Sequence, residues 1–292
     1  MSHLNRNKGI RKNIPLDKNQ TLAHSLLLDV ITDWALRIIM SVLLIGAAHF
    51  ARRIFIAERF EVPSNSMQPT LVPGDRIWVN KMLMGARIYK SFNFEDHAPL
   101  KCFRIPGFRK IRPGDVICFN NPLGYDKWTE IEFKINYVYC KRVVGVPGDT
   151  IGIKDGITWN NNYEGVLGSL TYQIMVQNTP DSILWANQMM MAMPFSYPWW
   201  TIKNLGPLYI PEKGATVSLD QGGRSIYGPV IRYETGSWPS DEMDSYTFKN
   251  NYYFAFGDYS IDSKDSRYFG FIPEDFIIGI VGGRKVRNNP NQ

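Results

Sequence analysis

The sequence predicts a mainly β protein: an N-terminal transmembrane helix followed by an antiparallel β-sheet domain into which a smaller α+β or β domain is inserted. Two observations lead to this prediction. An uncharged apolar run occupies residues 38–51, near the N-terminus. From Phe60 onward, short alternating segments are separated by Gly, Pro, Asn and Asp, and the turn sequence PGD occurs at 73–75, 113–115 and 147–149.

Residues 1–33 are expected to form a basic cytoplasmic tail and residues 34–56 the transmembrane helix. The uncharged run alone is shorter than the ~20 residues that a bilayer span needs. Arg37 on one side and Arg52 and Arg53 on the other can extend their charged ends to the interfaces, which lengthens the span to 34–56. The positive tail places the N-terminus in the cytoplasm and the remaining chain outside, although the Arg pair favours the opposite orientation.

Two other interpretations of the apolar run are a cleaved secretory signal and an amphipathic core helix. The tail before the run is long for a secretory signal, and the segment with candidate catalytic residues begins only a few residues after it. The run is apolar all round, which does not fit an amphipathic helix. Both observations favour a membrane anchor.

Seven segments are predicted to contain β-strands because β-branched and aromatic residues dominate them. We expect a first domain made of 57–151 and 249–286, an inserted domain at 152–248 and a C-terminal tail at 287–292. Within the insert, residues 182–193 could form a helix. The seven strand segments are 75–81, 115–122, 137–146, 150–161, 215–220, 252–258 and 276–286.

The insert contains two conspicuous apolar features, MMMAM at 189–193 and the pair Trp199-Trp200. Packing in a core is one explanation. The other is an apolar surface at the membrane interface, where Trp and Tyr are favoured. Burial of these side chains would distinguish the two.

The composition describes a globular protein, since 44% of the 292 residues are hydrophobic and only 21% are charged. Of the net charge of +6, a net +4 lies in residues 1–20, so the composition argues against nucleic-acid binding. There is no metal-like spacing and no glycine-rich phosphate loop, and we expect no cofactor or metal. The three cysteines are expected to be free thiols, with a Cys102–Cys118 disulfide as the alternative in an oxidising compartment.

A candidate nucleophile lies in PSNSMQPTL, residues 63–71, directly after the predicted membrane helix. Ser66 is flanked by Pro63 and Pro69, which stiffen the backbone, and a second serine, Ser64, lies two residues before it. Neighbouring hydroxyl and backbone N–H groups can supply an oxyanion hole.

Histidine, the usual activator of a catalytic serine, is scarce in this chain. Three of the four histidines, His3, His24 and His49, lie in the tail or in the apolar segment and its approach, and His97 lies in a charged, loop-like stretch. A Ser-His-Asp triad therefore does not fit, which leaves a Ser-Lys pair. Lysine acts as a base only when burial lowers its pKa, and Lys141 lies in an apolar predicted strand, INYVYCKRVVGVPGD.

Taken in order, the predicted span and four segments resemble the bacterial type I signal peptidases, membrane-anchored Ser-Lys endopeptidases with a β-structured catalytic domain. FEVPSNSMQPTL resembles the nucleophile segment of that family, PGDRIWVNK the next strand, and YVYCKRVVGVPGD the general-base segment. GDYSIDSKDSRYFGFIPEDFIIG resembles the last conserved segment, which commonly reads GDNRDNSxDSR in the family. Here residues 259–262 differ from that pattern, and Asn65 stands where glycine is common.

The resemblance implies a role for each matching residue. Ser66 would be the nucleophile and Lys141 the general base, and the Ser64 hydroxyl and the Ser66 N–H would form the oxyanion hole. Ser263 would hold the lysine amine, and an ion pair of Asp265 with Arg267 would support the site. The implied pocket for small substrate side chains would be lined by Phe60, Val62, Met67, Leu71, Ile77, Tyr139 and Cys140.

The resemblance also implies substrate and location. The enzyme would cleave N-terminal signal peptides from exported preproteins after small residues in an A-x-A pattern. It would be a monomer in the bacterial inner membrane, bound to the lipid bilayer by one span, with its catalytic domain on the periplasmic side. Two alternatives remain: a specialised peptidase for a single substrate such as a pilin, and a catalytically weak, membrane-tethered β-domain that binds extended peptides.

Overall fold

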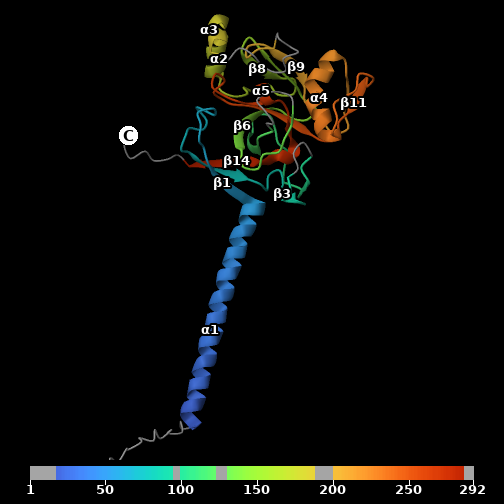
Figure 1. The fold of residues 1–292 in the computed structure, drawn as a ribbon. Helices are drawn as coiled ribbons and strands as arrows, with labels where there is room; N and C mark the ends of the chain where they lie inside the picture. The colour runs from blue at the N-terminus through green and yellow to red at the C-terminus, as the bar shows by residue number, and fades with distance from the viewer. Residues whose placement is uncertain (1–17, 95–98, 123–129, 188–199, 286–292) are drawn as a thin grey trace, which may run out of the picture. The chain divides into compact units, whose positions relative to one another are not determined.

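The computed structural model describes residues 18–94, 99–122, 130–187 and 200–285 (Figure 1). The chain divides into two compact units, Met1–Ala51 and Arg52–Gln292. Several features predicted from the sequence lie outside the described residues: the first part of the basic tail, the C-terminal tail at 287–292, the MMMAM run, Trp199 and His97.

The first unit contains helix α1, Lys18–Ala51, and the second unit begins with a π-helical turn, η1, Arg52–Ile56. The helix has no proline, and its only glycine is Gly46, so nothing in the sequence interrupts it. At 1.5 Å per residue its 34 residues extend ~51 Å, more than the ~30 Å of a hydrocarbon core. It begins sixteen residues before the predicted span at 34. The segment Ser25–Ile56 is long and apolar enough to cross a membrane.

The second unit is built on a seven-stranded sheet in the order β1-β2-β14-β5-β6-β12-β13. Every neighbouring pair is antiparallel, which confirms the predicted mainly antiparallel β fold. The C-terminal strand β14 lies between β2 and β5 and so joins the first strands to the middle of the sheet. The strands are β1 Ala57–Glu61, β2 Arg76–Asn80, β5 Val116–Asn120, β6 Val138–Gly145, β12 Tyr252–Phe256, β13 Ile272–Pro273 and β14 Ile277–Lys285.

Three smaller sheets and five further helices complete the described part of this unit. All seven segments predicted to contain strands do so, and α3 occupies the start of the helix expected at 182–193. The paired strands are β3 Arg87–Tyr89 with β4 Cys102–Arg104, β7 Thr150–Lys154 with β8 Ile157–Asn160 and β9 Leu205–Tyr209, and β10 Thr216–Ser218 with β11 Ser245–Thr247. The helices are α2 Leu170–Asn178, α3 Asp181–Ala186, α4 Gln221–Thr235, α5 Ser266–Phe269 and the 3-10 helix η2 Glu274–Phe276.

One large apolar core joins the seven-stranded sheet to much of segment 152–248. Val230 and Ile231 of α4 belong to the same buried cluster as Phe254 of β12. Trp200 is also part of this core, with 4% of its surface exposed, so its environment fits core packing and not a membrane-facing surface. The division of the chain into a first domain and an insert remains a prediction.

The three PGD sequences form the same turn. In each, Gly has a φ of about 90°, at Gly74, Gly114 and Gly148, and the backbone N–H of the Asp donates to a carbonyl three residues earlier. Proline followed by a left-handed glycine is typical of a type II turn. Each Asp carboxylate also accepts a backbone N–H across the turn, for example from Val146 to Asp149 at 3.0 Å.

We expect Asp149→Ala to destabilise the protein more than Asp115→Ala. The Asp149 carboxylate is buried and also accepts the side-chain amides of Asn160 and Asn162 at 2.7 and 2.8 Å. Loss of three charge-assisted bonds should cost about 3 kcal/mol, a fall in Tm of about 6 to 12 °C. Asp115, in the equivalent turn, is more exposed, so Asp115→Ala should lower the free energy of unfolding by only about 1 kcal/mol. Thermal unfolding of the full chain in detergent tests this, and equal falls in Tm would contradict it.

Candidate active site

The loop that carries Ser66 leaves the end of β1 and is fixed at both ends. The Val62 N–H donates to the Asp75 carbonyl at 2.9 Å, and the Gly74 N–H donates to the Val62 carbonyl at 2.8 Å. Between these bonds, Met67 is buried and packs in a small apolar cluster beneath the loop. The candidate nucleophile is therefore on an anchored loop and not on a free one.

Lys141 lies on β6 with its amine directed at Ser66. The distance from Lys141 Nζ to Ser66 Oγ is 2.5 Å, and only 4% of the lysine surface is exposed. Burial lowers the pKa of Lys141, and the nearby charge of Asp265 opposes this effect without overcoming it. A lowered pKa increases the fraction of neutral amine, the form that can accept a proton.

Ser64 lies beside Ser66 on the exposed side of the loop. Its hydroxyl oxygen is 3.2 Å from that of Ser66, within hydrogen-bonding distance. The structure thus brings together all three residues predicted for the nucleophile, the base and the side-chain oxyanion donor.

The last segment predicted for the site contributes a buried ion pair. Arg267 Nε and Nη2 donate to the two carboxylate oxygens of Asp265 at 2.9 and 2.7 Å, and the Gly257 N–H donates to the same carboxylate at 2.9 Å. Burial alone would raise the Asp265 pKa, but the charge and hydrogen bonds of Arg267 lower it. The pair therefore stays charged although both side chains are almost inaccessible to solvent.

Ser263, predicted to hold the lysine amine, is buried next to Gly257, and its hydroxyl has no hydrogen-bond partner among the described residues. A Cβ atom on Gly257 would lie 2.1 Å from the Ser263 hydroxyl oxygen and 2.5 Å from the Ser66 carbonyl oxygen. Only glycine therefore allows the last segment to pack this closely against the nucleophile. The hydrogen bond from Ser263 to Lys141 remains a prediction.

A second ion pair, which was not predicted, joins three parts of the site. Arg142, next to Lys141 on β6, donates to both carboxylate oxygens of buried Asp258 at 2.7 and 2.6 Å. Thr70, in the Ser66 loop, donates its hydroxyl to Asp258 at 2.5 Å. No local pattern in the sequence identifies a partner for Arg142 that lies 116 residues away.

Two of the residues at 259–262 that differ from the family pattern, Tyr259 and Ile261, pack against the segment between β6 and β12. The ring of Tyr259 lies 4.4 Å from that of Tyr172 in α2, measured between ring centres. Ile261 packs against the cluster formed by Val176, Leu184 and Ile202. The Tyr259 N–H donates to the Ser66 carbonyl at 3.1 Å, so this packing is connected to the nucleophile loop through one hydrogen bond.

A pocket of about 620 Å³ opens at Ser66 and Lys141. Six of the seven predicted lining residues border it, whereas Leu71 is buried in the cluster beneath it. The sequence analysis missed Cys118, Val138 and several polar residues of the lining, because a strand pattern does not show which cross-strand neighbours face a pocket. The lining comprises Phe60, Glu61, Val62, Pro63, Ser64, Asn65, Ser66, Met67, Ile77, Cys118, Asn136, Val138, Tyr139, Cys140, Lys141, Asp262 and Lys264.

The cysteines do not form the alternative disulfide. All three are free thiols, and Cys102 lies on β4, in a different sheet from Cys118 on β5. Cys118 is instead opposite Cys140 of β6 in the sheet register. Its hydrogen bond with Cys140, together with burial, raises the pKa of the Cys118 thiol, which keeps it protonated and apolar in character.

The mainly antiparallel fold, with a serine hydroxyl against a buried amine at an open pocket, defines a serine-type peptidase, a hydrolase of peptide bonds. The particular family follows from comparison with known proteins. The family described as "Signal peptidase, peptidase S26" matches residues 31–284, and the chain belongs to this family.

Relatives named signal peptidase I occur in several bacteria. The chain is 29% identical to one from Buchnera aphidicola subsp. Baizongia pistaciae over 248 residues, covering 80% of this chain and 70% of the relative. It is 29% identical to one from Pseudomonas aeruginosa over 237 residues, covering 80% of this chain and 63% of the relative. A crystal structure of a signal peptidase I from Enterococcus faecalis matches with 18% identity and a TM-score of 0.29, covering 59% of this chain and 97% of that one.

We expect Asp258→Asn to lower kcat/KM about 100-fold, since it weakens the connection between Thr70 in the Ser66 loop and Arg142 beside Lys141. A misplacement of about 1 Å at a reacting group costs a factor of this size. Steady-state kinetics on a peptide substrate measures it. Asp115→Asn is the matched control, because it breaks a comparable two-bond ion pair with Arg109 away from the pocket and should change kcat/KM less than two-fold. Equal losses in both variants would show that Asp258 has no special connection to the site.

Proposed function

We propose that this protein is a membrane-anchored signal peptidase in which Ser66 and Lys141 form a catalytic dyad that cleaves signal peptides from exported preproteins. The observation that supports this proposal best is the 2.5 Å contact between Ser66 Oγ and the buried Lys141 Nζ at the edge of an open pocket. Membership of the signal peptidase family supports the substrate class.

In this mechanism, neutral Lys141 removes the hydroxyl proton of Ser66 as Ser66 Oγ attacks the carbonyl carbon of the scissile bond. The resulting oxyanion accepts hydrogen bonds from the Ser64 hydroxyl and the Ser66 N–H. Lys141 then gives its proton to the leaving amine, and the C–N bond breaks to leave a Ser66 ester. A water, deprotonated by Lys141, attacks the ester carbonyl. As the bond between the acyl carbon and Ser66 Oγ breaks, Lys141 returns the proton to Ser66 Oγ, and the signal peptide leaves with a carboxylate end.

Two ion pairs hold the base and the nucleophile in position. Asp265 and Arg267 pair within the last segment, which reaches Ser66 through the Tyr259 N–H. Asp258 with Arg142 joins the Ser66 loop to β6. Both pairs are internally neutralised, so they order the site and add little net charge that would stabilise the ammonium form of Lys141.

The substrate would lie as an extended strand beside β1. Among the described strands β1 pairs only with β2, so its other edge is available for main-chain hydrogen bonds. Side chains of an extended peptide alternate, so those at −1 and −3 face the same way. Small residues at these positions, the A-x-A pattern, fit a pocket walled by Val62, Phe60 and Ile77.

The membrane arrangement is part of the proposal. Residues 34–56 span the bacterial inner membrane once, with the N-terminus in the cytoplasm. Residues 57–151 and 249–286 form the periplasmic catalytic domain, with 152–248 as an insert. The enzyme acts as a monomer that contacts the lipid bilayer and binds no nucleic acid.

A narrower substrate range is the second candidate. The packing of Tyr259 and Ile261 against α2 and its neighbouring cluster connects the last active-site segment to the insert. In an enzyme dedicated to one substrate, binding of that substrate to the insert could act on the active site through this connection. The short contact between Ser66 and Lys141 favours either peptidase over a domain that only binds peptides.

We expect the full chain in detergent micelles to cleave a preprotein with Ala at −1 and −3. Ser66→Ala and Lys141→Ala should each lower kcat by about 10³-fold or more. Lys154→Ala, which changes an exposed lysine on β7, is the control and should leave kcat unchanged. Gel analysis with N-terminal sequencing of the product measures this. Full cleavage by either dyad variant would refute the mechanism, and cleavage of one preprotein from a broad panel would establish the narrower range.

A further inference from the structure

A second pocket, of about 230 Å³, adjoins the candidate active-site pocket. The two pockets share Phe60 and Val138 in their walls, so a bound chain that fills the first continues past the second. Five of its nine lining side chains are charged or polar. Glu58, Lys81, Arg87, Tyr89 and Asn120 line it together with Phe60, Ile135, Val138 and Ile278.

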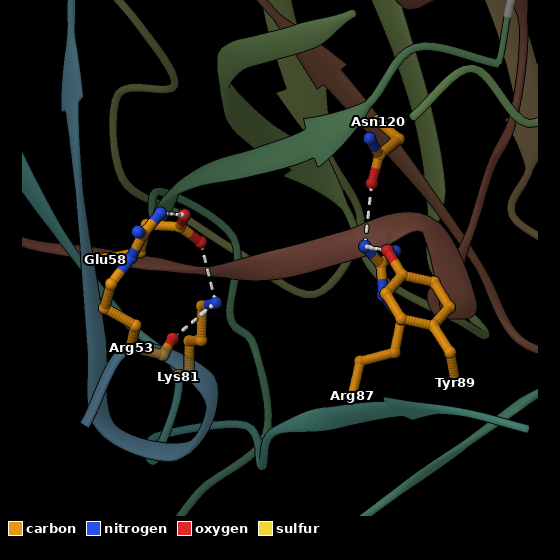
Figure 2. Close-up of polar contacts among 6 residues, drawn as sticks. All are labelled: Arg53, Glu58, Lys81, Arg87, Tyr89 and Asn120. Carbon is orange, nitrogen blue, oxygen red and sulfur yellow. Dashed lines mark hydrogen bonds and ion pairs between the residues drawn. The ribbon is translucent and has the colours of Figure 1, made fainter. Parts of the chain in front are cut away.

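One wall of this pocket carries a carboxylate between two cations. Figure 2 shows Glu58 bonded to both Lys81 and Arg53. Oxygens of the Glu58 carboxylate lie 2.7 Å from Lys81 Nζ and 3.2 Å from Arg53 Nη2. Burial alone would raise the Glu58 pKa, but the hydrogen bonds and charges of Lys81 and Arg53 lower it. Glu58 is therefore ionised, and the three side chains together have a net charge of +1.

The facing wall carries Arg87, whose hydrogen-bond partners among the described residues are all neutral oxygens. Its guanidinium donates to the Tyr89 hydroxyl at 2.5 Å and to the Asn120 amide oxygen at 2.8 Å (Figure 2). It also donates to the Asp275 backbone carbonyl at 2.6 Å. These bonds use three of the five N–H donors of the side chain. The Asp275 carboxylate attracts Arg87 from farther away but is not one of these partners.

The pocket therefore contains more positive than negative charge. Its lining carries two cations, Lys81 and Arg87, and one carboxylate, Glu58. The Arg87 donors are held in a fixed geometry by Tyr89 and Asn120. A planar guanidinium of this kind binds carboxylates through directed, charge-assisted hydrogen bonds. The complementary ligand is a small anionic group, and a volume of about 230 Å³ suits a side-chain carboxylate.

The position of the pocket along β1 indicates which part of a substrate reaches it. Val62, Phe60 and Glu58 are two residues apart and less exposed than Arg59 and Glu61 between them, so they share one face of the strand. Val62 and Phe60 border the first pocket, and Phe60 and Glu58 border the second.

The apolar part of a signal peptide lies in the membrane, and this fixes the direction in which the substrate chain runs along β1. A signal peptide is apolar on the N-terminal side of the cleaved bond, and β1 begins directly after the predicted span. Residues before the scissile bond therefore run from Ser66 back toward Ala57. With −1 and −3 in the first pocket, the next side chain on the same face is the one at −5.

We propose that the second pocket binds the side chain at position −5 of the substrate and favours an acidic residue there, with Arg87 as the principal anion-binding group and Lys81 contributing charge. This inference rests on the proposed function, because the numbering starts from cleavage at Ser66. It adds a selective subsite beyond the two small-residue positions.

The test uses the full chain in non-ionic detergent and peptides that differ only at −5, carrying Glu, Gln or Lys. The Glu peptide should exceed the Lys peptide about ten-fold in kcat/KM, the factor that one charge-assisted hydrogen bond supplies. Arg87→Gln should reduce this ratio to about two, and Glu58→Gln should increase it. Arg59→Gln is the matched control, since this arginine lies on the other face of β1 over Trp78, and it should keep the wild-type ratio.

Binding to Ser66→Ala, measured by fluorescence anisotropy with the same labelled peptides, separates this proposal from the proposed function. If none of the peptides is cleaved but Ser66→Ala still binds the Glu peptide most tightly, the peptidase mechanism is refuted and the −5 subsite stands. Equal binding and cleavage of the three peptides would overturn the subsite, as would an equal loss of preference in Arg59→Gln. If Arg87→Gln leaves the ratio intact but removes an activation by phosphatidylglycerol added to the micelles, the pocket binds a lipid phosphate and the peptide assignment is wrong.

Discussion

The active site depends on one constraint: the ionisable amine of Lys141 must be buried away from water and still contact the Ser66 hydroxyl. An ammonium at this position would lose its hydration, and burial lowers the pKa of Lys141 accordingly. The amine is nevertheless not isolated, because it lies 2.5 Å from Ser66 Oγ. Three segments distant in sequence must meet to create this environment: the loop after β1, strand β6, and the segment after β12.

The surrounding charges are arranged so that they order these segments without changing the state of the base. Asp265 and Arg267 neutralise each other within a two-bond pair, as do Asp258 and Arg142. An unpaired carboxylate beside Lys141 would favour the ammonium, whereas a paired one leaves burial as the dominant effect. Gly257 completes the arrangement, since any side chain there would collide with the backbone of Ser66.

The sequence allowed prediction of those features that have a local signal. Alternating apolar segments and PGD turns predicted the strands, and the scarcity of histidine together with a lysine in an apolar strand pointed to Ser66 and Lys141. Long-range partners had no such signal: Asp258 was not assigned to Arg142, and the packing of Tyr259 on Tyr172 depends on where α2 lies in space. The charged pocket was missed for the same reason, because Glu58, Lys81 and Arg87 come from three strands or strand ends.

The most direct test of this account is the pKa of Lys141 itself, measured by NMR titration of the full chain carrying ¹³C,¹⁵N-labelled lysine, with the resonance assigned by its loss in Lys141→Met. The account predicts that the Lys141 amine titrates below the range of the other lysines, and that kcat/KM rises with pH along the same curve as the neutral amine forms. Titration of Lys141 within or above the range of the exposed lysines would contradict it.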